Sequence, residues 1–137
     1  MGRLAATTND RLPGKTPDRS ASNRDGAVVV GVDIGGTKTA LMATDVATGK
    51  ELATHTCTTD PDAGPQAMTD QIADDVVTLL TEAGRDREQL RAVGIAVPGH
   101  VATESGRVIT AGNLSGWADI PLRDLVARKL DVPIWVD

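Results

Sequence analysis

The feature that most constrains the fold of this chain is an apolar, mostly β-branched run at Ala27–Asp33, stopped soon afterwards by Gly35 and Gly36. A continuous run of valines is typical of a strand that is buried on both faces. Two adjacent glycines can adopt backbone conformations closed to other residues, so they permit a tight turn directly after the strand. Thr37–Thr44 alternates like a second strand. We therefore expect two neighbouring antiparallel strands joined by a glycine turn.

Further along the chain, the hydrophobic period alternates between strand and helix. Glu51–Thr58 is predicted as a third strand, which extends the first two into an antiparallel meander. Apolar residues at helical spacing predict a helix over Pro65–Ala83, with Gly84 as its C-terminal cap. The remaining predicted elements are a strand at Arg91–Val97, a small hairpin of Val101–Ala102 with Arg107–Thr110, a helix at Pro121–Leu130 and a strand at Pro133–Val136.

The predicted order β-β-β-α-β-α-β indicates an α/β domain with a mixed five-stranded sheet. Helical crossovers join parallel strands, so the later strands should run parallel to the first. This order assigns one domain to residues 27–137. Met1–Gly26 is rich in polar and basic residues, contains Pro13 and Pro17 and shows no hydrophobic period. We expect it to be a disordered tail rather than a binding arm.

Charge and cysteine content exclude several function classes. The chain has 14 basic and 19 acidic residues, a net charge of −5, which gives no electrostatic footprint for nucleic acid. No apolar run approaches the ~20 residues of a membrane span, and the N-terminus does not resemble a signal peptide. Cys57 is the single cysteine, so neither an intrachain disulfide nor a cysteine-based zinc cluster can form. We expect a cytoplasmic protein with no nucleic-acid or membrane partner.

The strongest local signal is the string Asp33–Lys38, which follows the valine-rich run. Residues without side chains let a phosphate approach the main-chain amides, and Thr37 and Lys38 add a hydroxyl and a positive charge. Asp33 could orient Mg²⁺ through water, because Mg²⁺ loses its hydration shell reluctantly. The alternative is a simple Gly-Gly hairpin turn with solvated neighbours. The string is neither a P-loop nor a Rossmann fingerprint, because a strand follows it rather than a helix.

With this string, the chain resembles the ROK family of sugar kinases and repressors, particularly its glucokinase-like members. The resemblance spans Val28–Asp137. The further blocks that match in family order and spacing are Val93–Gly99, Asn113–Trp117, Pro121–Leu122 and Asp131–Asp137. It implies an RNase H-like, actin-like fold in which ATP and a sugar meet between two lobes, with this chain as the N-terminal lobe and the second lobe absent.

The resemblance also implies roles for individual residues. It assigns Gly35, Gly36, Thr37 and Lys38 to the ATP phosphates, Asp33 to Mg²⁺, and Gly99 and Asn113 to the sugar. Residue type alone favours Asn113 as a turn residue, and the resemblance reverses that preference. In the family the general base is the Asp of an Asn-Asp-x-Asn stretch. The alignment places this stretch immediately after Asp137, so we expect no catalytic residue within the chain.

The implied activity is ATP-dependent phosphorylation of a hexose, most simply of glucose at the 6-hydroxyl, by a full-length protein that is commonly a homo-oligomer in this family. We expect the 137-residue chain to be inactive alone, and a zinc motif only in the missing C-terminal part. Two alternatives stay open: a sugar-responsive repressor, for which Met1–Gly26 is too short to form a winged helix-turn-helix, and a noncatalytic sugar-binding lobe. Other hexoses and N-acetylhexosamines share these motifs.

Five further residues have simple structural interpretations. Trp117 and Trp135 are expected to pack in the core or in a cleft wall. Of the two histidines, His55 lies within the third strand and should be structural, whereas His100 follows Pro98-Gly99 and should face solvent. Cys57 is expected to be a small buried hydrophobe.

Overall fold

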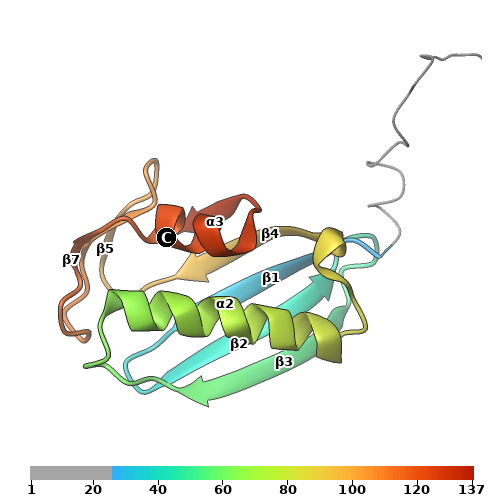
Figure 1. The fold of residues 1–137 in the computed structure, drawn as a ribbon, viewed down its shortest axis with the longest axis horizontal. Coiled ribbons are helices and arrows are strands. Elements are labelled where there is room, and N and C mark those ends of the chain that lie inside the picture. Colours follow the sequence, from blue (N-terminus) through green and yellow to red (C-terminus); the bar gives the residue numbers. More distant parts are fainter. Residues whose placement is uncertain (1–25) are drawn as a thin grey trace, which may run out of the picture.

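The computed structural model describes residues 26–137, so the predicted tail, apart from Gly26, lies outside the described residues. A five-stranded sheet in the order β3-β2-β1-β4-β8 forms the centre of the fold (Figure 1). Its strands are β1 (Val28–Ile34), β2 (Lys38–Asp45), β3 (Glu51–Thr58), β4 (Leu90–Ala96) and β8 (Ile134–Val136). The helices are α2 (Pro65–Glu82), the short 3₁₀ turn η1 (Arg87–Gln89) and α3 (Leu122–Leu130).

The strand directions confirm the predicted α/β fold with its mixed sheet. β1 pairs antiparallel with β2, which pairs antiparallel with β3. β1 and β4 are parallel, as are β4 and β8, because α2 and α3 provide the crossovers between them. Asp33, near the end of β1, lies opposite Ala40 in β2 and Ala96 in β4. The carboxyl ends of the three parallel strands therefore lie along one edge of the sheet.

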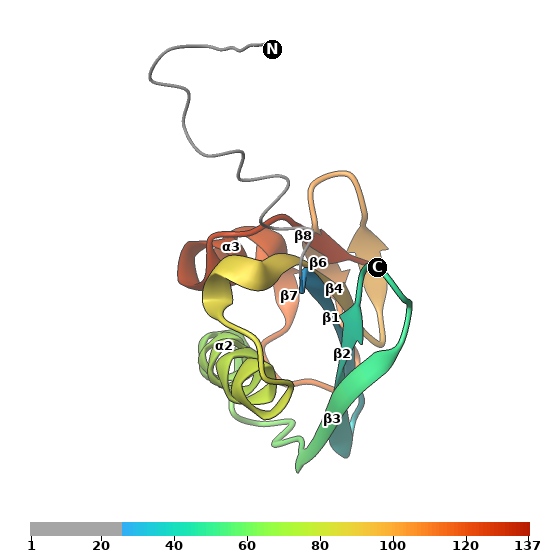
Figure 2. The same cartoon turned by 90° about the vertical axis from the view of Figure 1, so that its right-hand side faces the viewer.

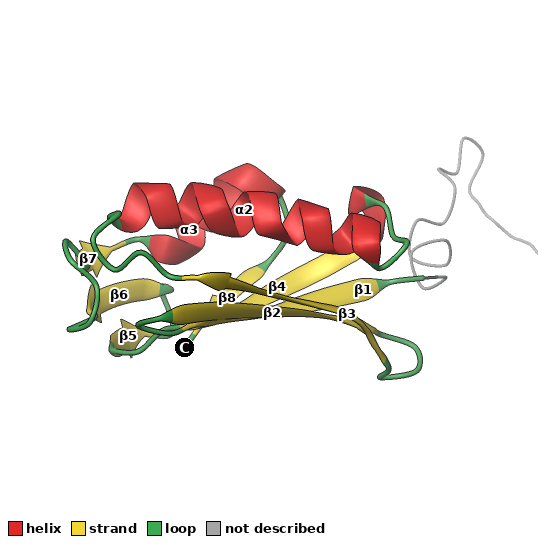
Figure 3. Ribbon diagram, turned by 90° about the horizontal axis from the view of Figure 1, so that it is seen from below, coloured by secondary structure: helices red, strands yellow, loops and turns green. Residues whose placement is uncertain are grey.

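Both helices cover the same face of the sheet (Figures 2 and 3). Every second residue of β1 points into this layer, so Val28, Val30, Val32 and Ile34 are at most 3% exposed. The helices contribute their apolar sides, and Ile72 and Val76 of α2 and Val126 of α3 are fully buried. Each such side chain stabilises the fold by roughly 1.5–3 kcal/mol. The core is therefore a single layer between the sheet and the two helices.

The other face of the sheet corrects the expectation that β1 is buried on both sides. Gly31 and Asp33 alternate with the buried valines and are exposed. Within residues 26–137, no helix lies against this face, as Figure 3 shows. On this second face β1 presents Val29, which is half-buried, followed by Gly31 and Asp33. A glycine and an aspartate therefore occupy the positions that would have to be apolar for this face to be buried.

A second, three-stranded antiparallel sheet lies at one end of the molecule (Figure 3). Its strands are β5 (His100–Ala102), β6 (Arg107–Thr110) and β7 (Ala118–Ile120). The β5–β6 hairpin confirms the sequence-based prediction, whereas β7 had not been predicted. β7 is only three residues long and contains Asp119 at a positive φ of 56°, so it carries no recognisable strand pattern. None of the helices in the described region is long and apolar enough to cross a membrane.

Candidate functional site

The glycine turn between β1 and β2 forms where the sequence predicted it. The Gly35 amide donates a hydrogen bond to the carbonyl oxygen of Lys38 at 2.9 Å, which closes the turn. A Cβ atom at Gly35 would lie 2.6 Å from that oxygen, so any larger residue would disrupt the turn. The Gly35 amide is therefore already used within the protein. This differs from the expectation that it faces a phosphate, and it leaves Gly35 a role in shaping the turn.

The next two amides in the turn have a different environment. Among residues 26–137, the amides of Gly36 and Thr37 donate to no other protein group, whereas the Thr37 carbonyl accepts a hydrogen bond from the Thr59 amide at 2.8 Å. Thr37 and Lys38 are both exposed. The turn is thus anchored on its carbonyl side and keeps two consecutive N–H groups available, which is the arrangement that binds anions such as phosphate.

Asn113 lies beside this turn, although it comes from a distant loop between β6 and β7. A Cβ atom on Gly36 would meet the Asn113 amide nitrogen Nδ2 at 3.6 Å and its Cβ at 3.7 Å. Neighbouring residues fix the loop: the Ser115 amide donates to the Pro61 carbonyl at 2.8 Å, and the Ser115 hydroxyl donates to Asp62 at 2.6 Å. The structure therefore places the predicted sugar-binding amide next to the predicted phosphate-binding turn.

Gly99 lies in the connection between β4 and β5, where two main chains pass very close to each other. A Cβ atom at this position would overlap the carbonyl oxygen of Thr110 and lie 2.8 Å from Cα of Ala111. The Gly99 amide donates to the Val97 carbonyl at 2.9 Å. Glycine is needed here for packing against the segment that leads to Asn113. This gives Gly99 a positioning role that the sequence analysis did not anticipate.

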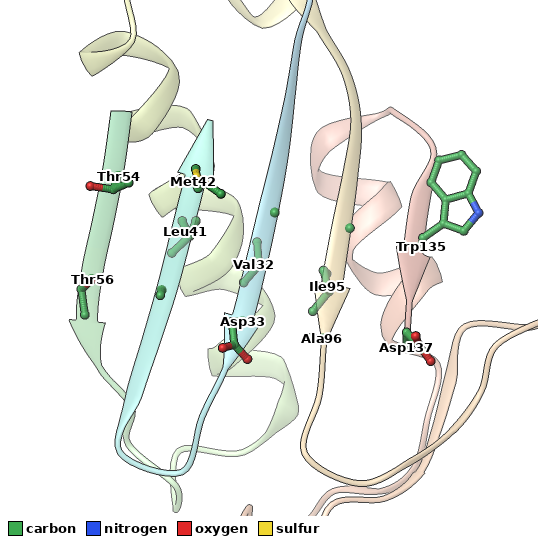
Figure 4. A pocket seen from close by; sticks show the side chains of 13 residues that line it. Val32, Asp33, Leu41, Met42, Thr54, Thr56, Ile95, Ala96, Trp135 and Asp137 are labelled. Atoms are coloured by element: carbon green, nitrogen blue, oxygen red, sulfur yellow. The ribbon is translucent and has the colours of Figure 1, made fainter. Parts of the chain in front are cut away.

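The open face of the sheet forms a hollow of about 660 Å³ (Figure 4). Small residues such as Gly31 and Gly94 are among those that line it, and Trp135 stands at one side. Two carboxylates line it, Asp33 from β1 and Asp137 just after β8, and Figure 4 shows both at the same end of the sheet. The Asp137 amide donates to the Ile95 carbonyl at 2.9 Å, which fixes its main chain beside β4.

These carboxylates suit a hard cation, because Mg²⁺ prefers oxygen ligands and keeps several waters when it binds. The sequence predicts Asp33 as a residue that orients Mg²⁺, whereas it assigns no role to Asp137, which only precedes the stretch expected to hold the base. The signal that could have identified it is its place at the end of a parallel strand, since ligands of open α/β sheets gather outside these strand ends.

The structure also places the two tryptophans, His100 and Cys57, for which the sequence suggested simple structural roles. Trp117 is buried in the core, as expected, whereas Trp135 is 64% exposed at the side of the hollow. His100 is exposed at the start of β5. Cys57 differs from the expectation of a small buried hydrophobe: it is partly exposed, and its thiol donates to Asp75 Oδ2 at 3.5 Å. Burial and the neighbouring Asp75 together raise the pKa of this thiol.

Comparison with known proteins identifies the family of the chain. The model of the ROK family matches residues 29–137. The chain is 34% identical over 110 residues to a glucokinase of Streptomyces coelicolor, an alignment that covers 80% of this chain and 32% of that protein. It is also 36% identical over 58 residues to a xylose repressor of Caldicellulosiruptor bescii, covering 42% of this chain and 14% of the repressor.

Among solved structures, a ROK family glucokinase from Streptomyces griseus in complex with glucose and AMPPNP superimposes with a TM-score of 0.62 and 33% identity. This match covers 81% of the chain and 33% of the glucokinase. The chain spans about a third of the length of the curated glucokinases that it matches.

Proposed function

This chain belongs to the ROK family and has its actin-like, RNase H-like fold, and from this premise we propose that it is the N-terminal lobe of an ATP-dependent hexose kinase. The proposed reaction of the whole protein transfers the terminal phosphoryl group of ATP to a hexose, glucose at its 6-hydroxyl in the first instance. The proximity of Gly36 to Asn113 carries the proposal, because it brings the turn proposed to bind phosphate and the amide proposed to bind sugar to one place.

The glycine turn would hold the phosphates by its main chain. Gly36 and Thr37 offer two free N–H donors, the Thr37 side chain adds a hydroxyl donor, and Lys38 adds a positive charge. Phosphoryl transfer is catalysed mainly by positioning and by stabilising negative charge, so donors fixed in a rigid turn between two paired strands are suited to it. Gly35 supports this arrangement by closing the turn rather than by contacting the ligand.

Asp33 and Asp137 would hold Mg²⁺ in the hollow, through water at Asp33. When bound, this ion neutralises charge on the transferring phosphoryl group. Asn113 would recognise sugar hydroxyls, since an amide both donates and accepts hydrogen bonds, as each hydroxyl does. Gly99 would line the same pocket while it keeps the Asn113 segment in place. The general base is proposed to follow Asp137, as the resemblance implies.

A kinase is favoured over a repressor by the extent of the alignments. The glucokinase alignment covers 80% of this chain, whereas the xylose repressor alignment covers 42%. The acidic excess of the sequence, a net charge of −5, also argues against DNA binding. We further propose a cytoplasmic protein that assembles as a homo-oligomer.

The decisive experiment measures ADP release by the full-length protein with ATP, Mg²⁺ and a panel of hexoses and N-acetylhexosamines. We expect release that depends on the sugar, with glucose giving the highest kcat/KM. Asn113→Ala should raise the KM for the sugar while the KM for ATP changes little. A protein that binds a sugar but releases no ADP with any of them would be a noncatalytic lobe. Sugar-dependent release from operator DNA without ADP formation would instead identify a repressor.

A further inference from the structure

A cluster of three potential metal ligands lies on the helix-covered side of the sheet, away from the hollow. Thr54 and Thr56 of β3 line the hollow, so the alternating residues His55 and Cys57 face the opposite way, toward α2. There they meet Asp75. His55 Nε2 lies 3.7 Å from Asp75 Oδ1, and Cys57 Sγ lies 3.5 Å from Asp75 Oδ2.

The three side chains offer nitrogen, sulfur and oxygen atoms that lie close enough together to surround one ion. One ligand atom from each lies within 4.8 Å of the other two. Zinc binds sulfur at about 2.3 Å and nitrogen or oxygen at about 2.0–2.2 Å, which places tetrahedral ligands roughly 3.3–3.7 Å apart. The two distances run to different oxygens of Asp75, so side-chain rotations that bring His55 and Cys57 around a single carboxylate oxygen would complete the site.

The surroundings of Asp75 also resemble those of a metal ligand. Asp75 is only 7% exposed, and Gln71 Nε2 donates a hydrogen bond to Asp75 Oδ1 at 2.9 Å. A hydrogen bond of this kind fixes the orientation of a ligating carboxylate. A buried carboxylate whose nearest partners are an amide, a thiol and a partly exposed histidine leaves negative charge only partly compensated. A divalent cation would compensate it fully.

We propose that His55, Cys57 and Asp75 form a zinc site, whose fourth ligand is a water molecule from the adjoining cavity. This cavity has a volume of about 230 Å³, and Cys57, Gln71 and Asp75 line it together with Thr39 and Thr59. On binding, the Cys57 thiol loses its proton to solvent and the thiolate bonds to the metal. Thiolate and imidazole ligands favour zinc over magnesium or calcium.

The zinc would join an edge strand to the helix that covers it, because two ligands come from β3 and one from α2. β3 pairs only with β2 in the sheet, so its other edge has no partner strand in the described structure. The site is thus expected to be structural, holding β3 against α2. It uses none of the residues assigned to ATP, Mg²⁺ or sugar, and its test is independent of kinase activity.

The test is a titration of the purified 137-residue chain, without any affinity tag, with Zn²⁺ in competition with a chromophoric chelator. Substitution with Co²⁺ provides a spectrum, in which thiolate-to-cobalt charge transfer can come only from Cys57, the single cysteine. We expect one equivalent of metal, the charge-transfer band, and a higher Tm with Zn²⁺ than with EDTA. Cys57→Ser should remove the band and the Tm shift.

The two histidines supply a matched pair of variants. His55→Gln should weaken zinc binding on the order of tenfold or more, whereas His100→Gln, at an exposed position in β5, should leave it unchanged. His55 is 30% exposed, so its replacement should leave a folded protein even if Cys57→Ser does not. Wild-type protein without a zinc-dependent Tm shift, or His55→Gln with unchanged zinc affinity, would overturn the proposal.

Discussion

The two faces of the five-stranded sheet differ in exposure and in the size of their side chains, although the same strands form both. On the covered face, β1 presents Val30 and Val32 to the helices. On the open face it presents Gly31 and Asp33 to a hollow lined in part by small residues. The covered face therefore supplies the buried apolar surface that stabilises the domain. The other holds the hollow, with the carboxylates of Asp33 and Asp137 at one end.

The largest expected effect comes from removing a side chain on the covered face. Ile72 of α2 is fully buried between the helix and the sheet, so Ile72→Ala should lower the free energy of unfolding by about 2–5 kcal/mol. Met42→Ala, on the open face, should cost less than about 1 kcal/mol, because Met42 is 41% exposed. Urea denaturation of both variants measures the difference. Equal losses would show that the open face contributes to the core.

A pair of glycines extends the comparison to the main chain. Gly99→Ala would force a Cβ atom against the backbone of Thr110 and Ala111, which cannot move aside as a side chain could, and should cost about 3 kcal/mol. At Gly31, on the open face, a Cβ atom would meet nothing within 4 Å. Gly31→Ala should therefore leave stability unchanged or raise it by about 0.5–1 kcal/mol. Thermal unfolding of the two variants distinguishes these outcomes. A stable Gly99→Ala protein would contradict the close backbone approach.

Asp33 tests whether the open face serves chemistry rather than folding. Asp33→Asn removes a carboxylate charge from an exposed position, so the free energy of unfolding should change little. In the full-length protein, kcat/KM should fall about tenfold, and the Mg²⁺ concentration needed for half-maximal activity should rise. Both effects are expected for a residue that acts on the ion through water. Asp131→Asn, at the C-terminal cap of α3, is the matched control and should keep wild-type activity. Unchanged Mg²⁺ dependence in Asp33→Asn would remove this residue from the site.

Local patterns predicted most of the covered face, whereas contacts between distant segments could not be read from them. The strand around Val30 and the turn at Gly35 depend on neighbouring residues, and both are found where the sequence indicated. The close approach of the main chains at Gly99 and Thr110 and the hydrogen bond between Cys57 and Asp75 depend on how separate elements pack. Hydrophobic periodicity carries no information about such packing. The open face was missed for the same reason: a run of valines shows that a strand is apolar but not which elements will cover it.

The adjacency of Gly36 and Asn113 was implied only by the family resemblance. Residue type favoured Asn113 as a turn residue, and nothing in its own loop points to the glycine turn. The structure places the two side by side, but the binding roles of both remain predictions that depend on ligand measurements.

The smallest expected effect lies at the outer surface of the helical layer, where Lys129 Nζ of α3 lies 2.8 Å from Asp70 Oδ1 of α2. This hydrogen-bonded pairing holds the pKa of Asp70 below its ordinary value of 3.8. A carboxyl whose pKa is lowered by folding stabilises the native state above its ordinary pKa, and this contribution is lost as the pH falls through the lowered value. Asp70→Asn should therefore slightly reduce stability at neutral pH and make the curve of stability against pH less steep below about pH 4.

Both partners are about half exposed, so high salt should reduce the difference between wild type and variant. Urea denaturation at pH 7 and pH 3, at low and high salt, measures this, with Lys129→Met as the second variant of a double-mutant cycle. A wild-type and an Asp70→Asn protein with parallel pH profiles would mean that apolar packing alone holds the two helices together on the covered face.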